Sequence, residues 1–371
     1  MAIDWLDQRR EDRIRVTMVS PTDFGSAYGE LEGVDLSGSS LNCAYYSDTR
    51  SGGRIRVAGG GWVRGSALRV THEVPAAGYR RELGTWYVTA DPVTRGRDGT
   101  WGQELTLQSP LWALSKHVEG RPWTVAKGAS ALSAMRDMLR RCGRPCDLGG
   151  ARDLRAGSTL SLDESASYLR RLFELAKASG NRVDLDGLGR VTVRPYVVPA
   201  QRVPSMRVDV DASRGVVHEG VTRESTWLSM PSQSVVACKW TESQGSGRDR
   251  KGVERVITAR ADARGHASPA ARGYTVTDYH SEPDMQPRTQ ARAERLARQY
   301  LARASAERVE WRLTCQYLPL WEGDVVWLSV TDGPAEYRGR RKCLVKSVEL
   351  RLDTMQMGLT LKETGSPDEE D

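Results

Sequence analysis

Trp311-Arg-Leu-Thr-Cys-Gln-Tyr-Leu-Pro-Leu-Trp-Glu-Gly-Asp-Val-Val-Trp-Leu-Ser-Val330 opens the part of the chain that decides its fold. Two further runs follow it, Lys342-Cys-Leu-Val-Lys-Ser-Val-Glu-Leu-Arg-Leu352 and Gln356-Met-Gly-Leu-Thr-Leu-Lys362. Apolar and polar residues alternate in each run, which is typical of half-buried antiparallel strands. Turn residues such as Glu322-Gly-Asp324 separate the runs. The pattern predicts a β-meander, and a meander of this kind contains no obvious catalytic group.

Length and composition place the chain among ordinary globular proteins. Its 371 residues are enough for two or three domains with their own cores. Charged residues stand where a signal peptide would need an apolar core, and no apolar run reaches the roughly 18 residues of a membrane span. The net charge is +6, and the positive residues are spread along the chain and do not form one block. This distribution favours charged residues on the solvent-exposed faces of strands and helices. Four of the six cysteines lie in predicted strands, which indicates reduced, buried thiols.

The first 115 residues are predicted to form a β domain. Residues 4–12 could form a short helix, and from Arg13 onward one strand follows another with glycine-rich turns between them. Several short strands with hairpin turns favour a small barrel or sandwich. The predicted strands are Arg13–Val19, Leu41–Tyr46, Arg54–Val57, Leu68–Val74, Glu82–Ala90 and Gln103–Leu107.

Residues 116–203 are predicted to form a small α+β insert. The stretch from Ser130 to Cys142 has helical periodicity and ends at a glycine. A second helix should begin at a capping box formed by Ser161 and Glu164. Two β-rich runs around the turn Asp186–Gly189 then predict a hairpin.

Residues 204–371 are predicted to form a second β domain, with one long helix over residues 288–306. The helix has an apolar face and an exposed side rich in arginine. Residues 244–252 should form an exposed loop. Strands are predicted at Met206–Val210, Ser234–Thr241, Val253–Ala259 and Tyr274–Thr277. The expected fold is therefore α+β and mainly β, with two barrel or sandwich domains flanking a helical insert.

We find no convincing metal or cofactor site in the sequence. Cys142 and Cys146 supply half of a zinc site, but a structural zinc ion needs four ligands and no second pair exists. The pairs Asp184/Asp186 and Asp209/Asp211 could bind a cation, although alternating solvent-facing carboxylates explain them better. The glycines at 187/189 and 59–61 lack the context of nucleotide-binding loops. We expect no metal ion and no cofactor.

The sequence also offers no catalytic residue that stands out. His280-Ser281-Glu282 is a local trio, but neighbours in sequence rarely reach triad geometry. His218 and His266 resemble loop residues. Two functions of other classes stay open: a cell-wall hydrolase that uses two carboxylates, and a basic nucleic-acid-binding module.

Tryptophan is abundant, with 11 residues, and packs either in cores or at protein interfaces. Since no active site is evident, the interface interpretation gains weight. The candidate interface residues are Trp321, Trp327, Arg298 and Tyr300.

Four stretches in this order resemble the tail hub, or baseplate hub, proteins of long-tailed phages. They are Ser161–Pro195 with its hairpin, Ser234-Val-Val-Ala-Cys-Lys-Trp-Thr-Glu242, the helix 288–306 that leads into Trp311, and Leu318-Pro-Leu-Trp-Glu-Gly-Asp-Val-Val326. The resemblance covers most of the chain from Ser130 onward and the N-terminal strands more loosely.

The resemblance implies a structural virion protein without catalytic activity. Each protomer of such a hub carries two similar β domains, so a homotrimer presents a pseudo-sixfold ring. This ring joins the hexameric tail tube to a threefold tip and lines the channel for DNA and the tape measure protein. The implied partners are the tail tube, distal tail, tape measure and spike or tip proteins, and the implied location is the virion tail.

Overall fold

The structure is a computed structural model of the whole chain. It describes residues 3, 5, 10–59, 61–96, 99–156, 159–162, 164–211, 217, 220–225, 230–244, 251–282, 288–304 and 309–364. The chain divides into two compact units. The larger holds Met1–Val221 and Arg312–Leu361, and the smaller holds Thr222–Trp311 and Lys362–Asp371. Strands make up 47% of the described residues and helices 18%, so the fold is mainly β, as predicted.

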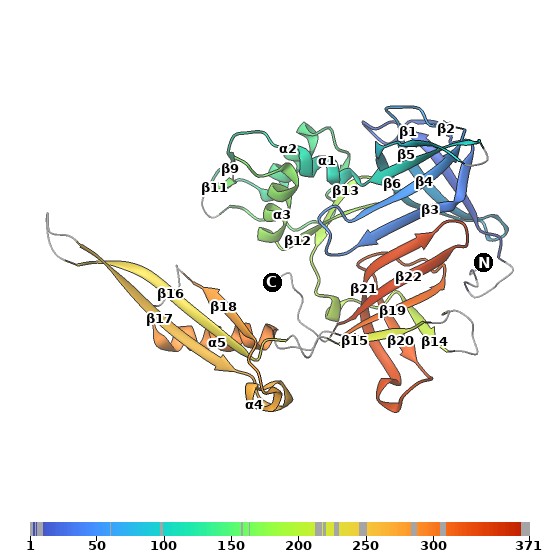
Figure 1. Ribbon diagram of the computed structural model, residues 1–371. Coiled ribbons are helices and arrows are strands. Elements are labelled where there is room, and N and C mark those ends of the chain that lie inside the picture. Colours follow the sequence, from blue (N-terminus) through green and yellow to red (C-terminus); the bar gives the residue numbers. More distant parts are fainter. Residues whose placement is uncertain are drawn as a thin grey trace. The chain divides into compact units, whose positions relative to one another are not determined.

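One large sheet forms the body of the larger unit (Figure 1). Its strands run in the order β19-β22-β21-β3-β4-β8-β6-β5-β1-β2, with β7 beside β8, β20 beside β21 and β14 beside β20. Strand β14 runs parallel to β20, whereas the neighbours from β21 through β3, β4, β8, β6, β5 and β1 to β2 pair antiparallel, as do β20 with β21 and β7 with β8. The strands are β1 (Arg13–Val19), β2 (Ala27–Glu30), β3 (Val34–Ala44), β4 (Ser51–Ala58), β5 (Ala67–Val74), β6 (Tyr79–Ala90), β7 (Val93–Arg95), β8 (Trp101–Gln108), β14 (Met206–Val210), β19 (Val309–Gln316), β20 (Val325–Val330), β21 (Gly339–Arg351) and β22 (Gln356–Glu363).

The long strand β21 joins the N-terminal and C-terminal strands of this sheet. Its first half pairs with β20, and its residues Ser347–Arg351 pair with Ser40–Ala44 of β3. The predicted strands of the C-terminal region are confirmed, but they are not a simple meander, because β19 lies beside β22. The expectation of closed barrels is wrong, because the described residues form one large sheet with smaller sheets and no closed barrel. Alternation identifies strands, but it does not say which strand edges meet.

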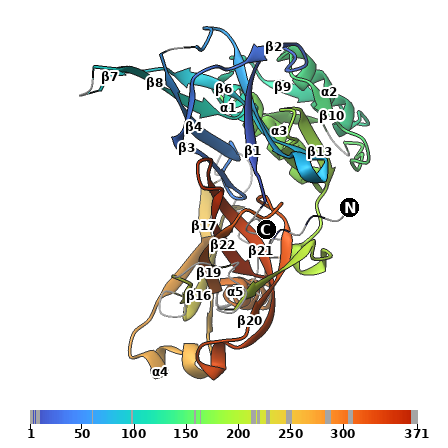
Figure 2. The same ribbon diagram turned by 90° about the vertical axis from the view of Figure 1, so that its right-hand side faces the viewer.

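The helical insert lies beside the sheet and has its own core (Figure 2). Met135, Met138 and Leu139 of α2 pack there with Leu169 and Leu172 of α3. Its elements are α1 (Pro110–Lys116), β9 (Trp123–Val125), α2 (Ala131–Arg141), β10 (Cys146–Asp147), β11 (Leu160–Leu162), α3 (Tyr168–Ala178), β12 (Asn181–Leu185) and β13 (Val191–Pro195). Short 3-10 turns occur at Pro75–Ala77, Pro199–Gln201 and Ala335–Tyr337.

Two details of the insert differ from the sequence prediction. The predicted helix start at Ser130 is confirmed, since the Ser130 side chain accepts a hydrogen bond from the Ser133 amide. The capping box at Ser161 is wrong, because residues 160–162 pair with β9 as strand β11, and α3 begins after the N-cap Ser167. The short helix α1 was not predicted; its start is Ser109-Pro110, where proline suits the first turn.

The smaller unit is a three-stranded sheet covered on one face by a helix. The strand order is β17-β16-β18, and α5 packs through Ala293 and Ala297 on Val236, Cys238 and Ala259. Its elements are β15 (Thr222–Ser225), β16 (Gln233–Gln244), β17 (Lys251–Asp262), a 3-10 turn at Gly265–Ala267, α4 (Pro269–Arg272), β18 (Thr277–Ser281) and α5 (Gln290–Ala304).

Most predictions for the smaller unit are confirmed. The strand predicted at Tyr274–Thr277 begins only at Thr277, because the tight turn at Gly273 delays it. The predictions for residues 4–12, 245–250, 305–306 and His218 fall wholly or largely outside the described residues. None of the described helices combines the length and the apolar character that crossing a membrane requires.

Candidate interaction surfaces

Trp327 lies on a basic face of the large sheet. Its half-buried ring is 4.0 Å, centroid to guanidinium carbon, from Arg340. Arg207 of β14 and Lys342 of β21 are its partners in the neighbouring strands. Stacked tryptophan and arginine side chains are common at the centres of protein interfaces. The arrangement fits the predicted interface role of Trp327 without testing it.

Trp321 lies in the turn before β20. The Trp321 amide donates a 2.8 Å hydrogen bond to the Asp324 carboxylate, and its side chain is half-buried. The strand begins at Val325, as the Gly-Asp-Val-Val pattern predicted. Trp321 therefore helps to shape this turn, and its interface role stays a prediction.

Tyr300 packs within its own unit. Its ring stacks on His280 at a centroid distance of 3.8 Å, and its hydroxyl donates a hydrogen bond to Glu282. His280 in turn is 2.7 Å from the carboxylate of Asp278. The trio His280-Ser281-Glu282 thus positions α5 against β18, and its histidine is oriented by an aspartate and a tyrosine.

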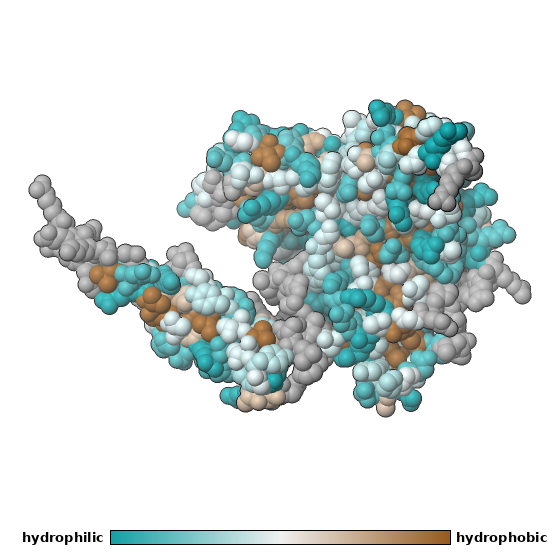
Figure 3. All heavy atoms as spheres, viewed as in Figure 1, coloured by the Kyte–Doolittle hydropathy of each residue, from teal (hydrophilic) through white to brown (hydrophobic). Residues whose placement is uncertain are grey.

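Arg298 lines a groove of about 860 Å³ between α5 and β17. Small side chains line the groove, among them Ala259, Ala261, Ala263 and Ala302. Its charged lining residues include Glu294 and Arg260. Strand β17 is the edge of its sheet over its 12 residues, and the Gln290 side chain caps the carbonyl of Thr258. Figure 3 shows apolar residues set among hydrophilic ones along this extended hairpin. A long edge with small neighbouring side chains is suited to pairing with another strand.

A second hollow, of about 1010 Å³, crosses the open face of the large sheet where β3 meets β21. We call it the polar hollow. Its lining is dominated by small polar residues and glycines, among them Ser40, Asn42, Gly52, Gly53, Thr106, Thr314, Ser347, Gly358 and Thr360. Three arginines in the lining face two glutamates, so the surface is almost neutral. Sequence reasoning missed this surface, although the small polar residues at alternate strand positions were a signal for it.

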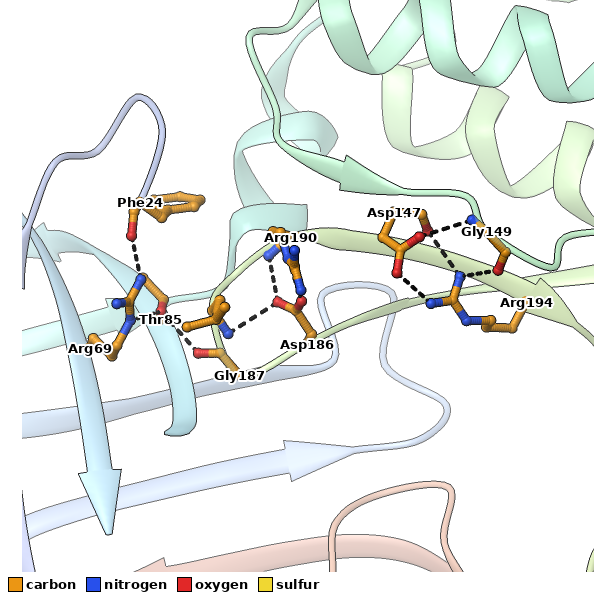
Figure 4. Close-up of polar contacts among 10 residues, drawn as sticks. Phe24, Arg69, Thr85, Asp147, Gly149, Asp186, Gly187, Arg190 and Arg194 are labelled. Carbon is orange, nitrogen blue, oxygen red and sulfur yellow. Dashed lines mark hydrogen bonds and ion pairs between the residues drawn. The ribbon is translucent and has the colours of Figure 1, made fainter. Parts of the chain in front are cut away.

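The turn of the hairpin β12–β13 attaches the insert to the sheet (Figure 4). The Thr85 hydroxyl of β6 donates a 3.0 Å hydrogen bond to the Gly187 carbonyl. Arg69 donates to the Thr85 hydroxyl and to the Phe24 carbonyl. A Cβ atom at Gly187 would lie 2.2 Å from the Glu82 carbonyl oxygen, so only glycine allows this approach. The predicted hairpin therefore ends in a docking contact.

A second contact of the insert is built around Tyr45, which is fully buried. The Arg182 guanidinium of β12 lies 3.4 Å from the centre of its ring. Arg202 donates hydrogen bonds to the Tyr45 hydroxyl and to the Gly323 carbonyl. Arg182 also pairs with Asp184 at 2.9 Å. We call this cluster, together with the docked turn, the joint; it ties the insert to β3 and to the turn before β20.

The two cysteines of the insert have different surroundings. Cys142 is 3.7 Å from the ring of His117, whereas Cys146 lies in β10 beside Val191 of β13. Burial, helped by the nearby Glu119, raises the pKa of Cys142 to about 11, which disfavours the thiolate that binds zinc. Over the described part of the chain, no three His, Cys, Asp or Glu residues are grouped to hold a metal ion.

Solved structures share this architecture. No family model matches the chain, and the comparison with curated proteins found no match. It is similar to the tail protein from Neisseria meningitidis MC58, with 14% identity and a TM-score of 0.62 over 95% of this chain and 97% of that one. The 43 kDa tail protein of prophage MuSo2 from Shewanella oneidensis is 12% identical, with a TM-score of 0.60 over 96% of this chain and 100% of that one. A prophage tail protein from Listeria monocytogenes EGD-e is 9% identical, with a TM-score of 0.52 over 94% of each chain. Over nearly its whole length, this chain has the fold of phage tail proteins.

Proposed function

We propose that this chain is a structural protein of a phage tail or a related particle, and that it is the hub that joins the hexameric tail tube to a threefold tip. The observation that carries the proposal is the fold match, which covers nearly all of this chain and of each tail protein compared. At 14% identity or less, the match supports the fold, and the step to a tail function is ours.

The polar hollow supports a channel-lining role. Its small, almost neutral side chains offer neither an apolar patch nor the dense positive charge that holds nucleic acid. A surface of this kind allows DNA and an extended protein to pass without strong binding. In this proposal residues 1–115 and 204–371 supply the ring-building β regions, and residues 116–203 are the insert between them.

The edge of β17 and its groove support self-association. An edge strand of 12 residues, bordered by Arg298 and small alanines, can accept a strand from a second copy. Head-to-tail contacts of this type close into a ring when the rotation between copies allows it. We propose a homotrimer, with Arg298 and Tyr300 near one contact and Trp321 and Trp327 at another.

The same proposal names partners and a location. The tail tube, distal tail, tape measure and spike or tip proteins would contact the hub, and DNA would pass through it transiently. The chain would be assembled in the host cell, reside in the virion tail and catalyse no reaction.

Electron cryomicroscopy of tails that contain this chain tests the proposal. We expect three copies in a ring at the end of the tail tube, with the polar hollow facing the channel. Native mass spectrometry of the purified chain, alone and with the tube protein, adds the copy number. A strict monomer within tail particles, or a location on the outside of the tail, would contradict the hub role.

A further inference from the structure

One half-buried acidic residue of the joint has no role in the proposed assembly. Glu322 stands in the turn before β20, and its Oε2 atom is buried without a hydrogen-bond partner in the described structure. The neighbouring Gly323 adopts a left-handed φ of +86° and packs on Tyr45, and its amide donates to the Val345 carbonyl. The turn is thus held firmly on both sides of the Glu322 side chain.

The groups that face this carboxyl come from several elements. Cys43 of β3 is its hydrogen-bonding neighbour, and Arg182 and Asp184 of β12 act on it with opposite signs. Arg182 is already paired with Asp184 at 2.9 Å and stacked on Tyr45. It is therefore only partly available to neutralise a second carboxylate.

Further charges surround the turn without cancelling a charge on Glu322. Arg50 lies 3.6 Å from Asp184, and Arg202 donates to the Gly323 carbonyl. Asp324 accepts from the Trp321 amide, and Arg81 and Arg202 are its nearest cations. Burial raises the pKa of Asp324 as well, so burial acts in the same direction on both acids of the turn.

We propose that the Glu322 carboxyl is a pH-sensitive latch of the joint: when it is protonated the insert is held closed against the sheet, and when it ionises the joint loosens. An ionised carboxylate placed here would be desolvated, beside Asp184, and short of a free cation. The backbone around Tyr45 and Gly323 must then open to admit water. The proposal does not depend on the function of the protein.

The pH range of the latch follows from the environment of the carboxyl. Burial, opposed by Cys43 and Arg182 and helped by Asp184, raises the pKa of Glu322 from 4.5 to about 7. A folded-state pKa above the unfolded value means that the closed joint is favoured fully below about pH 4.5. This preference is lost as the pH rises toward and through about 7.

Hydrogen–deuterium exchange of the full chain at pH 5.5 and 8.5, normalised to the unfolded chain, tests the latch. In the wild type we expect the amides of β12 and of residues 321–325 to open at least about tenfold more often at pH 8.5. Glu322→Gln mimics the protonated group and should keep them protected at both pH values. The matched control Glu349→Gln, on the exposed face of β21, should behave as the wild type.

A second variant keeps the proposal open to disproof. Glu322→Leu removes the charge by a different route, and it decides the question if Glu322→Gln does not fold. Loss of the pH response in the folded variant supports the latch. A folded variant that still opens at pH 8.5 as the wild type does would overturn it.

Discussion

The joint of the larger unit and the β17 edge of the smaller unit show two opposite uses of a strand. At the joint, the turn of β12–β13 approaches β6 so closely that Gly187 has no room for a side chain. Arginines fill the remaining space around Tyr45. At β17, one edge is left beside a groove of about 860 Å³. The joint therefore holds the larger unit together, whereas the edge of β17 has no further strand of its sheet beside it among the described residues.

Gly187→Ala should have the largest effect on stability, because it breaks the joint at its closest point. The new Cβ would lie 2.2 Å from the Glu82 carbonyl oxygen, so the backbone of β6 or of the turn has to move. We expect a loss of about 3 kcal/mol in the free energy of unfolding, measured with urea. The control Gly25→Ala meets only the Asp23 side chain at 3.9 Å and should change little. Equal losses in the two variants would contradict the close fit.

Arg182→Leu removes the second half of the joint and should have a smaller effect. The substitution loses the stacking on Tyr45 and the ion pair with Asp184, while it keeps much of the buried volume. We expect a loss of about 1–2 kcal/mol in the urea experiment. Arg56→Leu serves as the control, since the Arg56 side chain is 52% exposed beside Asp35. A loss no greater than that of the control would show that the cluster does not stabilise the joint.

The joint also marks the limit of what the sequence predicts. The hairpin Arg182–Arg194, the helix after Ser130 and nearly all strands follow from local periodicity and turn residues. The contacts of Gly187 with β6 and of β3 with β21 join residues far apart in the chain, and no local pattern specifies them. The polar hollow was missed for the same reason, because six strands supply its lining. For two interface candidates no sequence pattern indicated their surroundings: in the structure Arg298 lines a groove, and the Tyr300 ring stacks on His280.

Acid should weaken the larger unit slightly more than the smaller one. Burial alone raises the pKa of Asp12, but hydrogen bonds from His72 and Arg10 outweigh it and hold this pKa below 3.8. The contribution of Asp12 is therefore present above about pH 3.8 and is lost as the pH falls through its lower folded value. Because the cost of burying the Asp12 carboxylate offsets most of the gain from His72 and Arg10, we expect a contribution of less than about 1 kcal/mol.

Asp12→Asn tests this expectation. In urea unfolding between pH 7 and pH 2.5, the variant should lose less stability on acidification than the wild type. Asp262→Asn, on strand β17, is the matched control, because the Asp262 side chain is 45% exposed and its ion pair with Arg260 lies at the surface. If Asp262→Asn changes the loss of stability in acid more than Asp12→Asn does, the expectation that Asp12 matters more than Asp262 is wrong.

The smallest effect on stability is expected at the open edge itself. Ala302→Arg places a long cationic side chain in the groove beside β17, on an exposed position of α5. Arginine is a good helix former, so the free energy of unfolding should change by less than about 0.5 kcal/mol. Self-association should nevertheless be lost, because the side chain occupies the path of an incoming strand and adds charge next to Arg298. Ala270→Arg, an exposed substitution of the same kind on α4, should leave association intact. Native mass spectrometry of the two variants measures their oligomeric state. A folded but monomeric Ala302→Arg variant would show that the β17 edge is needed for assembly. An Ala302→Arg oligomer like that of the wild type would show that the contact between copies lies elsewhere on the molecule.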